Sequence, residues 1–402
     1  MKNLFKIANW CVVRIIVKAK NIVVNYKFDA RFGCTCSHCG ERMKKHMKKQ
    51  ICNVLDLPVL DKETRYDVET IQFRCPQCGK FHTPRPALFH PTKNYTWRFM
   101  EKISREHFHA PADFVAEEAG ISDSTVRRID REVLAETLPP PNNDNLEKIL
   151  VDEKYLGAQK GFVTLVINAK TGEPVALNEG KNKISLDVFF KNLTPEQRAK
   201  ILCVGIDRGN AFRLAIEENI PHAKICYDPF HLVSNFNEIV DSVRRSEFLS
   251  VPAEIKELIC GNRYLLLKSP EKLSVPAQEK LALLLKSNET LNKTYLLKEQ
   301  FRAIFKIKDA LEAQLALVSW IKMAFKSGIS RVQKFARKIE LHFRQIANAF
   351  VYKVNSGKIE ATNATLKRII SKTCGVSDVD YLFLKLRQHF YFCRVDFISQ
   401  PE

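Results

Sequence analysis

Long apolar runs are absent from this sequence. No stretch approaches the roughly 20 consecutive uncharged apolar residues that a transmembrane helix requires. The apolar run from Ile7 to Val24 is interrupted by Arg14, Lys18 and Lys20, and it lacks a small-residue cleavage site. We therefore expect neither a membrane-spanning helix nor a secretory signal.

Acidic residues are too few to balance the basic ones. The 402 residues include 64 Lys and Arg against 45 Asp and Glu, a formal net charge of +19. This surplus indicates a polyanionic partner, with nucleic acid as the first candidate and an anionic membrane surface as the second. Hydrophobic content of 45% and charged content of 27% describe a folded chain with room for several domains, not a disordered one.

Cysteine is abundant, and its spacing indicates a metal site. The twelve cysteines stand in a long sequence without an expected secretory signal, so metal ligands and free thiols are favoured over disulfides. Two CxxC-Gly knuckles, 35 residues apart, offer four thiolates from Cys36, Cys39, Cys75 and Cys78. This pattern predicts a closed tetrahedral Zn²⁺ site with a structural role. Cys34 and His38 lie close enough to substitute as ligands, whereas Cys52 is expected to be unrelated.

A strand-rich ribbon is expected around these knuckles. Residues 68–74 alternate in the manner of a strand and lead into the second knuckle. The first knuckle is followed by a basic run that is either a phosphate-contacting segment or a solvated face. This run comprises Lys44, Lys45, Lys48 and Lys49. We place a zinc-binding domain at residues 1–95.

A helix-turn-helix is predicted over residues 96–138. Residues 112–119 are expected to form one helix, and Ser122 or Asp123 to cap a second helix that ends near residue 134. The residues of the second helix expected to contact DNA are Ser124, Thr125, Arg127, Arg128 and Arg131. Any helical hairpin with a glycine turn would fit the same pattern. The proline-rich stretch that follows predicts a linker at residues 139–145.

Two apolar, strand-like runs downstream each end in an acid. Asp152 follows residues 148–151, and Asp207 follows residues 201–206. Three strands followed by alternating helices and strands are typical of a ribonuclease H-like α/β sheet, with the first strand in the middle and the fourth beside it. The two carboxylates are therefore expected to converge, although Asp207 could instead cap the helix predicted from residue 211.

A third acid lies 153 residues beyond Asp207. Glu360, Asn363 and Lys367 follow one another at i, i+3 and i+7, so a helix would carry all three on one face. Alone, that face could be ordinary solvated surface. Together with Asp152 and Asp207, Glu360 predicts a site for Mg²⁺ or Mn²⁺, because these cations prefer oxygen ligands.

In these features the sequence resembles the ISL-three family of bacterial insertion-sequence transposases, which are DDE enzymes with an N-terminal zinc-binding module. The resemblance covers nearly the whole length. It includes the double CxxC, the helix-turn-helix, Val151-Asp152-Glu153, Asp207, Asp228-Pro229-Phe230-His231, Val243-Arg244-Arg245 and the Glu360-x-x-Asn363 helix. It implies that Asp152, Asp207 and Glu360 are the metal ligands. Asp228, a rival to Asp207 by spacing alone, then becomes a supporting active-site residue with His231.

The resemblance also implies an architecture and a reaction. A multidomain α/β protein is expected, in which a ribonuclease H-like core at residues 146–234 and 350–395 is interrupted by a helical insertion at residues 235–349. The implied transposase binds its terminal inverted repeats as double-stranded DNA and catalyses Mg²⁺-dependent strand cleavage and transfer. Asn363 would orient a carboxylate or a DNA oxygen, and Lys367 and Arg368 would hold a phosphate. A homodimer or larger assembly is expected because two ends must meet, in the bacterial cytoplasm at the nucleoid.

Two other functions fit the same residues. A catalytically inactive, transposase-derived DNA-binding regulator would keep the zinc site, the helix-turn-helix and the net charge. A ribonuclease H-like nuclease would cut DNA without strand transfer. A Glu360→Gln variant distinguishes an enzyme from a regulator, and joined DNA products distinguish transposition from simple cutting.

Overall fold

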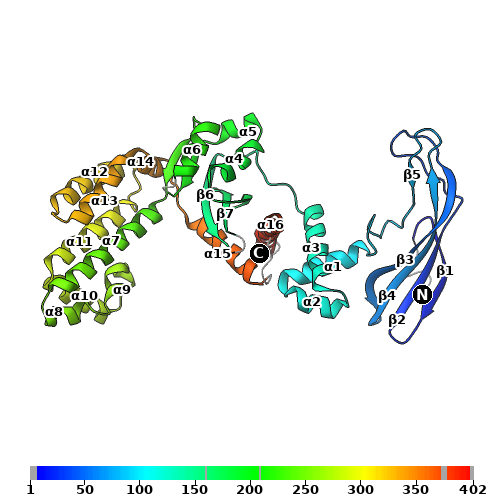
Figure 1. Cartoon of the computed structure of the whole chain (residues 1–402), viewed down its shortest axis with the longest axis horizontal. Coiled ribbons are helices and arrows are strands. Elements are labelled where there is room, and N and C mark those ends of the chain that lie inside the picture. The colour runs from blue at the N-terminus through cyan, green and yellow to red at the C-terminus, as the bar shows by residue number, and fades with distance from the viewer. Residues whose placement is uncertain (1–6, 159–160, 208–209, 373–377, 399–402) are drawn as a thin grey trace. The chain divides into compact units, whose positions relative to one another are not determined.

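The computed structural model describes residues 7–158, 161–207, 210–372 and 378–398 (Figure 1). Residues up to Leu138 form one compact unit, and nearly all residues from Pro139 onward form a second. The junction falls at the start of the proline-rich stretch of the sequence. Within these residues no helix combines the length and the apolar character needed to cross a membrane.

The first unit begins with a five-stranded sheet. Its strands are β1 (Trp10–Val17), β2 (Asn21–Phe28), β3 (Lys44–Val59), β4 (Lys62–Arg74) and β5 (Phe81–His82). They are ordered β1-β2-β4-β3, and β5 pairs with β4. Buried and less buried residues alternate along β2 and β4, so one face of the sheet packs on a core that includes Val24, Tyr26 and Tyr66. The strand predicted at residues 68–74 is confirmed as the end of β4.

Three helices complete the first unit: α1 (Trp97–His109), α2 (Ala112–Ala119) and α3 (Asp123–Thr137). The two predicted helices are confirmed as α2 and α3. The side chain of Ser122 caps α3 by accepting from the Thr125 backbone N–H at 3.2 Å, and Gly120 turns the chain at φ +65°. The prediction missed α1, which is tied to α3 because Ser104 Oγ donates to Asp130 Oδ1 at 2.6 Å.

The second unit is built on another five-stranded sheet. Its strands are β6 (Lys148–Tyr155), β7 (Phe162–Asn168), β8 (Pro174–Glu179), β9 (Cys203–Ile206) and β10 (Lys224–Tyr227). The order is β10-β9-β6-β7-β8, so the first strand lies in the middle with the fourth, β9, beside it, as predicted. The strands β6, β9 and β10 run parallel, whereas β7 and β8 are antiparallel to their neighbours. The carboxyl ends of three adjacent strands therefore share one edge.

Helices cover both faces of this sheet. They are α4 (Lys183–Lys191), α5 (Pro195–Lys200), α6 (Asn210–Asn219), α15 (Gly357–Lys372) and α16 (Val379–Ile398). Val151 belongs to a core cluster with Phe190 of α4, whereas Leu150 belongs to a different one with Leu366 of α15 and Leu382 of α16. Successive residues of a strand point to opposite faces, which explains this division of neighbouring β6 side chains.

A large helical region is inserted in the sequence between β10 and α15, that is, between the two segments that form the sheet-and-helix core (Figure 1). It contains α7 (Pro229–Ser250), α8 (Ala253–Ile259), α9 (Arg263–Leu267), η2 (Pro270–Lys272), α10 (Val275–Ser287), α11 (Glu289–Ile304), α12 (Ala310–Lys326), α13 (Ser330–Leu341) and α14 (Phe343–Tyr352). Its centre is aromatic, with the rings of Phe301 and Trp320 at 4.5 Å and those of Phe236 and Phe335 at 5.0 Å. The helix α7 runs without a break across residue 235, where the insertion was expected to begin.

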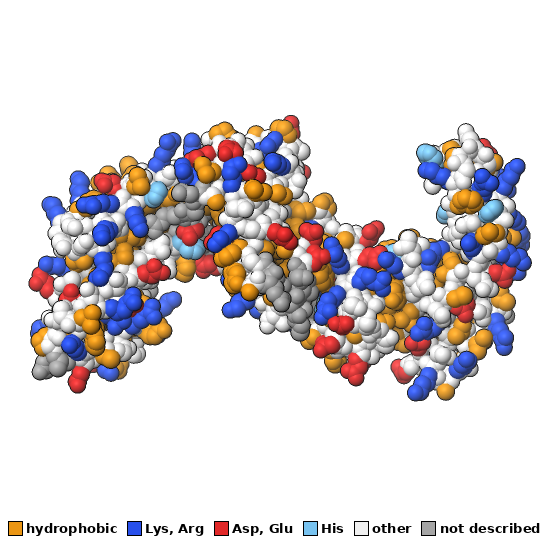
Figure 2. Space-filling model, in the orientation of Figure 1, with side chains coloured by type: hydrophobic (Ala, Val, Ile, Leu, Met, Phe, Trp, Pro, Cys, Tyr) orange, Lys and Arg blue, Asp and Glu red, His pale blue; other side chains and the backbone are white. Residues whose placement is uncertain are grey.

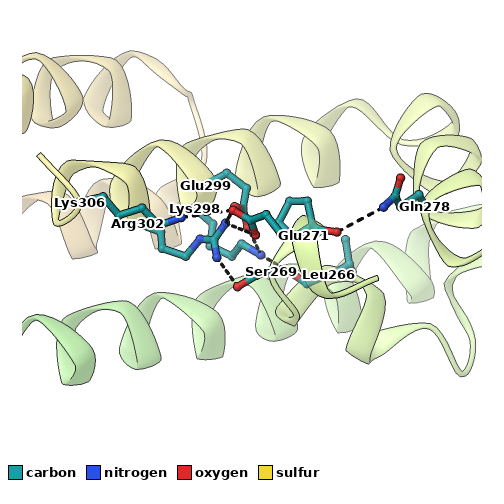
Figure 3. Close-up of polar contacts among 9 residues, drawn as sticks. Leu266, Ser269, Glu271, Gln278, Lys298, Glu299, Arg302 and Lys306 are labelled. Atoms are coloured by element: carbon teal, nitrogen blue, oxygen red, sulfur yellow. Dashed lines mark hydrogen bonds and ion pairs between the residues drawn. The ribbon is translucent and has the colours of Figure 1, made fainter. Parts of the chain in front are cut away.

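A buried polar network ties the short segments α9 and η2 to α11 (Figure 3). Lys298, only 2% exposed, donates to the Leu266 carbonyl at 2.6 Å and pairs with Glu299 at 2.6 Å. Arg302 pairs with Glu299 at 2.6 Å and with Glu271 at 3.1 Å. Each of these two cations faces at least one acid, so neither charge is left unpaired where the helices pack together.

Candidate active site and cysteine metal centre

The four predicted cysteine ligands lie together in the first unit. The Sγ atoms of Cys36, Cys39, Cys75 and Cys78 are all within 4.8 Å of one another. The pairs Cys36–Cys78 and Cys39–Cys75 are each 3.5 Å apart. This arrangement could hold a metal ion and fits a zinc ribbon. The group does not include Cys34, His38 or Cys52, among the residues that the structure describes.

Glycines close both knuckles around the cysteines. The backbone N–H of Gly40 donates to the Cys36 carbonyl at 2.9 Å, and that of Gly79 donates to the Cys75 carbonyl at 3.1 Å. Both glycines have positive φ, +73° and +71°, which other residues rarely adopt. Hydrogen bonds from backbone N–H groups lower the pKa values of the Cys36 and Cys75 thiols, whereas burial and hydrogen bonds with the neighbouring thiols raise those of Cys39 and Cys78.

The five residues of the helix-turn-helix that were predicted to contact DNA lie on α3. Three of them, Ser124, Arg128 and Arg131, are exposed, and Thr125 and Arg127 are half-buried. Arg127 forms an ion pair with Asp123 at 2.9 Å, one helical turn earlier. Contact of this helix with DNA stays a prediction.

Three aspartates lie at the shared edge of the second sheet. Leu150 of β6 pairs with Gly205 of β9, and the register continued by two residues sets Asp152 opposite Asp207. The same step from β9 to β10 sets Asp228 beside Asp207, and the Asp228 N–H donates to the Ile206 carbonyl at 3.1 Å. A small pocket at this edge is lined by Leu150, Val151, Asp152, Gly205, Ile206, Asp207, Asp228, His231, Val354, Ser356 and Ile359. We call the sheet edge that carries Asp152, Asp207 and Asp228 the acidic edge.

The strand β6 does not end at the acids, contrary to the prediction. It continues to Tyr155 because residues 152–155 pair with β7, with Asp152 opposite Leu165. Asp152 therefore lies within a paired strand and is held by backbone on one side. Asp207, in contrast, follows the end of β9 and is exposed.

His231 and Asp228 form an ion pair in the first turn of α7. Asp228 caps the helix by accepting from the Phe230 N–H at 3.2 Å, and its other oxygen lies 2.6 Å from His231 Nδ1. This hydrogen bond raises the pKa of His231 to about 9, with support from the charges of Asp207 and Asp152. The edge therefore carries a positive charge beside its acids at neutral pH.

Asn363 of α15 reaches the first acid across 211 residues of sequence. Its Nδ2 donates to Asp152 Oδ2 at 2.6 Å, and the Glu153 N–H donates to Asp152 Oδ1 at 2.8 Å. Burial nevertheless raises the pKa of Asp152. The Oδ1 atom of Asn363 is buried and has no hydrogen-bond partner in the described part of the chain.

Glu360 lies on the same helix but is held by a different donor. Ser356 Oγ donates to Glu360 Oε1 at 2.6 Å, one turn earlier at the start of α15. Within the described ranges, Asp152, Asp207 and Glu360 do not form a group with ligand atoms all within 4.8 Å. Carboxylates repel one another. Asp152 accepts a hydrogen bond from the Asn363 amide, and Glu360 accepts one from the Ser356 hydroxyl; both donors are neutral. Sequence reasoning missed Ser356, whose signal was its place four residues before Glu360.

Two basic residues follow further along α15. Lys367 and Arg368 are both exposed, and Arg368 Nη2 donates to Thr365 Oγ1 at 2.9 Å. The helix face predicted to carry Glu360, Asn363 and Lys367 is buried at Asn363 and exposed at Lys367.

Acids gathered at the edge of an α/β sheet, in a chain with a net charge of +19, are typical of proteins that act on nucleic acids. The family model DDE_Tnp_ISL3, described as "Transposase", matches residues 149–386, a range that contains Asp152, Asp207 and Glu360. The chain belongs to this ISL3 family of transposases.

Two named transposases are similar in sequence to this chain over most of its length. The transposase for insertion sequence element IS1001 of Bordetella parapertussis is 26% identical over 358 residues, which cover 88% of each chain. The transposase for insertion sequence element IS1557 of Mycobacterium tuberculosis is 28% identical over 329 residues, covering 76% of this chain and 74% of the relative. The resemblance to an insertion-sequence transposase is thereby confirmed.

Proposed function

We propose that the protein is a DDE transposase that binds the terminal inverted repeats of its insertion sequence and catalyses metal-dependent strand cleavage and strand transfer. The observation that carries this proposal is the acidic edge. There Asp152, Asp207 and Asp228 lie at one level of three parallel strands, and Asn363 of α15 is bonded to Asp152 from 211 residues away. Membership of the ISL3 transposase family supports it.

The order of the second sheet supports a ribonuclease H-like core. Its first three strands are antiparallel neighbours, and the fourth and fifth lie parallel to the first on its other side. Helices cover both faces. This layout sets Asp152, within β6, near Asp207 and Asp228, which follow β9 and β10, and a catalytic core of this kind would need such acids close together.

The donors at the acidic edge fit a hard divalent cation. Asp152, Asp207 and Glu360 would hold Mg²⁺ or Mn²⁺, because these ions prefer carboxylate oxygens and retain water ligands. The buried Oδ1 of Asn363 is an acceptor suited to such a water. When bound, the cation would activate a water or a 3′-hydroxyl and stabilise the leaving oxygen.

The chain's own residues would prepare the edge for this reaction. Asn363 fixes the orientation of Asp152, and Ser356 fixes that of Glu360. His231 has its Nδ1 on Asp228, so its other ring nitrogen would be free to donate to a phosphate oxygen.

DNA recognition would come from other elements. The exposed residues of α3 would read the inverted repeats, and the cysteine cluster would bind Zn²⁺ to stabilise the ribbon. Lys367 and Arg368 would hold a phosphate near the acidic edge. A dimer or larger assembly would bring the two ends together.

Cleavage at the element boundaries tests this function. The full chain is incubated with Mg²⁺ or Mn²⁺ and a plasmid that carries the gene with its natural flanks. We expect boundary cuts and joined products from wild type, and a rate more than about 100-fold lower from Glu360→Gln, since even outer-shell changes at metal sites cost 10–100-fold. The control is Glu340→Gln, at an exposed glutamate of α13, which should cut normally.

Each of the other possible results supports a different function or a different metal site. Tight, specific end binding without cutting by wild type indicates a DNA-binding regulator. Cuts without joined products indicate a nuclease. Equal cutting by Glu360→Gln and Glu340→Gln removes Glu360 from the metal site.

A further inference from the structure

A cluster of arginines surrounds one acid on the helical region. Asp241 of α7 forms ion pairs with Arg244 at 2.9 Å, Arg245 at 3.5 Å and Arg263 of α9 at 3.3 Å. The side chain of Asp241 is 11% exposed, whereas those of Arg245 and Arg263 are 67% and 52% exposed. The nearly buried carboxylate of Asp241 is thus surrounded by guanidinium groups, two of which are exposed to solvent. We call Arg244, Arg245 and Arg263 the arginine cluster.

One carboxylate cannot satisfy three guanidinium groups. A carboxylate accepts about four hydrogen bonds, whereas each guanidinium has about five N–H donors, so most donors of the arginine cluster remain available. Its net charge with Asp241 is positive. The network of Figure 3 differs in its ratio of charges, because there two acids, Glu271 and Glu299, pair with three cations, Lys298, Arg302 and Lys306. Figure 2 shows Lys and Arg side chains gathered at the α9 end of the helical region.

We propose that the arginine cluster binds a backbone phosphate of the DNA duplex that is cut at the acidic edge. Guanidinium groups bind phosphate oxygens in pairs, and two of the three here are exposed and converge on one point. Asp241 acts as a positioning residue, because its carboxylate aims arginines from two different helices at the same place. The inference rests on the proposed function, and it adds a second DNA contact distant from the reacting phosphate.

The helix α7 links this contact to the acidic edge. His231 and Arg245 are fourteen residues apart on one continuous helix. Two heptads drift by about 40° around a straight helix, so the two side chains leave α7 on nearly the same side. The separation along the axis is about 21 Å, which matches about six base pairs at 3.4 Å each. For a duplex that runs parallel to α7, the cluster would then contact a phosphate about six base pairs from the cut, on the strand that faces the helix there.

One acid shares this side of the helix. Glu238 lies midway between His231 and Arg245 and is exposed. Its charge opposes DNA at the middle of this face, so removal of that charge should strengthen binding. The opposite signs expected for Glu238 and the arginines give the proposal two independent checks.

The salt dependence of DNA binding tests the proposal. The full chain binds a duplex that carries one element boundary, without divalent metal, over a range of salt concentrations. The variants are Arg245→Ala/Arg263→Ala and Glu238→Gln, with Arg337→Ala as control at an exposed arginine of α13. Because each lost phosphate contact reduces the slope of log K against log salt by about 0.9, and the cluster is proposed to bind one phosphate, the double variant should lose about one unit. Arg337→Ala should keep the wild-type slope, and Glu238→Gln should bind more tightly.

Single neutral methylphosphonates then locate the contact. A neutral linkage about six base pairs from the boundary should weaken binding by wild type and leave the double variant unaffected. An unchanged slope and affinity in a folded double variant would overturn the inference, even if wild type cuts at the boundaries. A reduced slope in a protein that never cuts would instead keep the DNA contact and reject the proposed reaction.

Discussion

At the scale of single residues, hydrogen-bond donors decide the charge at the acidic edge. Asp152 has a neutral amide donor and Glu360 a neutral hydroxyl donor, whereas Asp228 has an imidazole at 2.6 Å. The first two donors orient a carboxylate without cancelling its charge. The imidazole instead becomes charged, because the surrounding acids favour its protonated form.

The first residue-scale prediction concerns the titration of His231. In the metal-free protein its pKa should be about 9, and Asp228→Asn should lower it toward the ordinary 6.5, because the principal cause of the shift is removed. Since the folded-state pKa is raised, the ion pair stabilises the fold fully below pH 6.5 and loses this effect as pH rises through 9. Imidazole NMR titration gives the pKa, and urea unfolding at both ends of this range gives the stability.

Two results would contradict that prediction. One is a His231 pKa unchanged in Asp228→Asn. The other is an advantage of wild type over the variant that grows toward alkaline pH. Added Mg²⁺ should lower the pKa of His231, because a nearby cation opposes protonation.

The sequence predicted the acids better than it predicted their partners. Asp152 and Asp207 follow apolar runs, a local pattern that needs no tertiary information. The resemblance implied that Asn363 orients a carboxylate or a DNA oxygen, but its bond to Asp152 joins residues 211 apart, and no local pattern shows which acid Asn363 meets. Whether Asp152, Asp207 and Glu360 bind metal together stays a prediction.

At the scale of elements, prediction succeeded where turn signals were strong. The helix α2 was expected at residues 112–119 and has these ends, with Gly120 turning the chain after it. The strand β6 was expected to stop at Asp152, yet it pairs with β7 as far as Tyr155. Acidic residues are unfavourable in strands on propensity, but cross-strand pairing overrides this preference here.

An element-scale prediction concerns β9. A Cβ on Gly205 would lie 2.6 Å from Leu150 Cδ2 and 2.8 Å from Val354 Cγ1, both closer than van der Waals contact. Gly205→Ala should therefore cost about 1–3 kcal/mol through overpacking. Because Gly205 lies two residues before Asp207, boundary cutting should also fall. Thermal unfolding should show a lower Tm for the variant. The control is Gly33→Ala in the first unit, where a Cβ would meet only Arg42 atoms at 3.6 Å, and it should leave the unfolding transition of the second unit unchanged. An unchanged transition of the second unit in Gly205→Ala would refute the overpacking argument.

At the scale of the whole molecule, the two compact units have separate hydrophobic cores. Val24, Tyr66 and Phe99 belong to clusters confined to residues before Leu138, whereas Phe236 and Leu366 belong to clusters formed after it. Units with separate cores can unfold in separate steps. The cysteine cluster belongs to the first unit, so its effect on stability should be confined there.

Metal removal provides the molecule-scale prediction. Wild type should contain one Zn²⁺ per chain, measured by elemental analysis, and Cys39→Ser should lose it because four thiolates close the site. Cys52→Ser is the control, since Cys52 is an exposed cysteine outside the cluster. Structural zinc contributes about 10–16 kcal/mol in small zinc modules, so its loss should lower the first unfolding transition strongly. The second transition should not move.

DNA binding separates the roles of the two units. In Cys39→Ser, specific binding to the inverted repeats should fall, because α3 shares a unit with the ribbon. Weak, salt-dependent binding through the arginine cluster should persist, because Arg245 and Arg263 lie in the other unit. A variant that loses its zinc yet keeps full end specificity would show that recognition of the repeats does not depend on the ribbon. Equal loss of specific and nonspecific binding would show that the two units do not act separately on DNA.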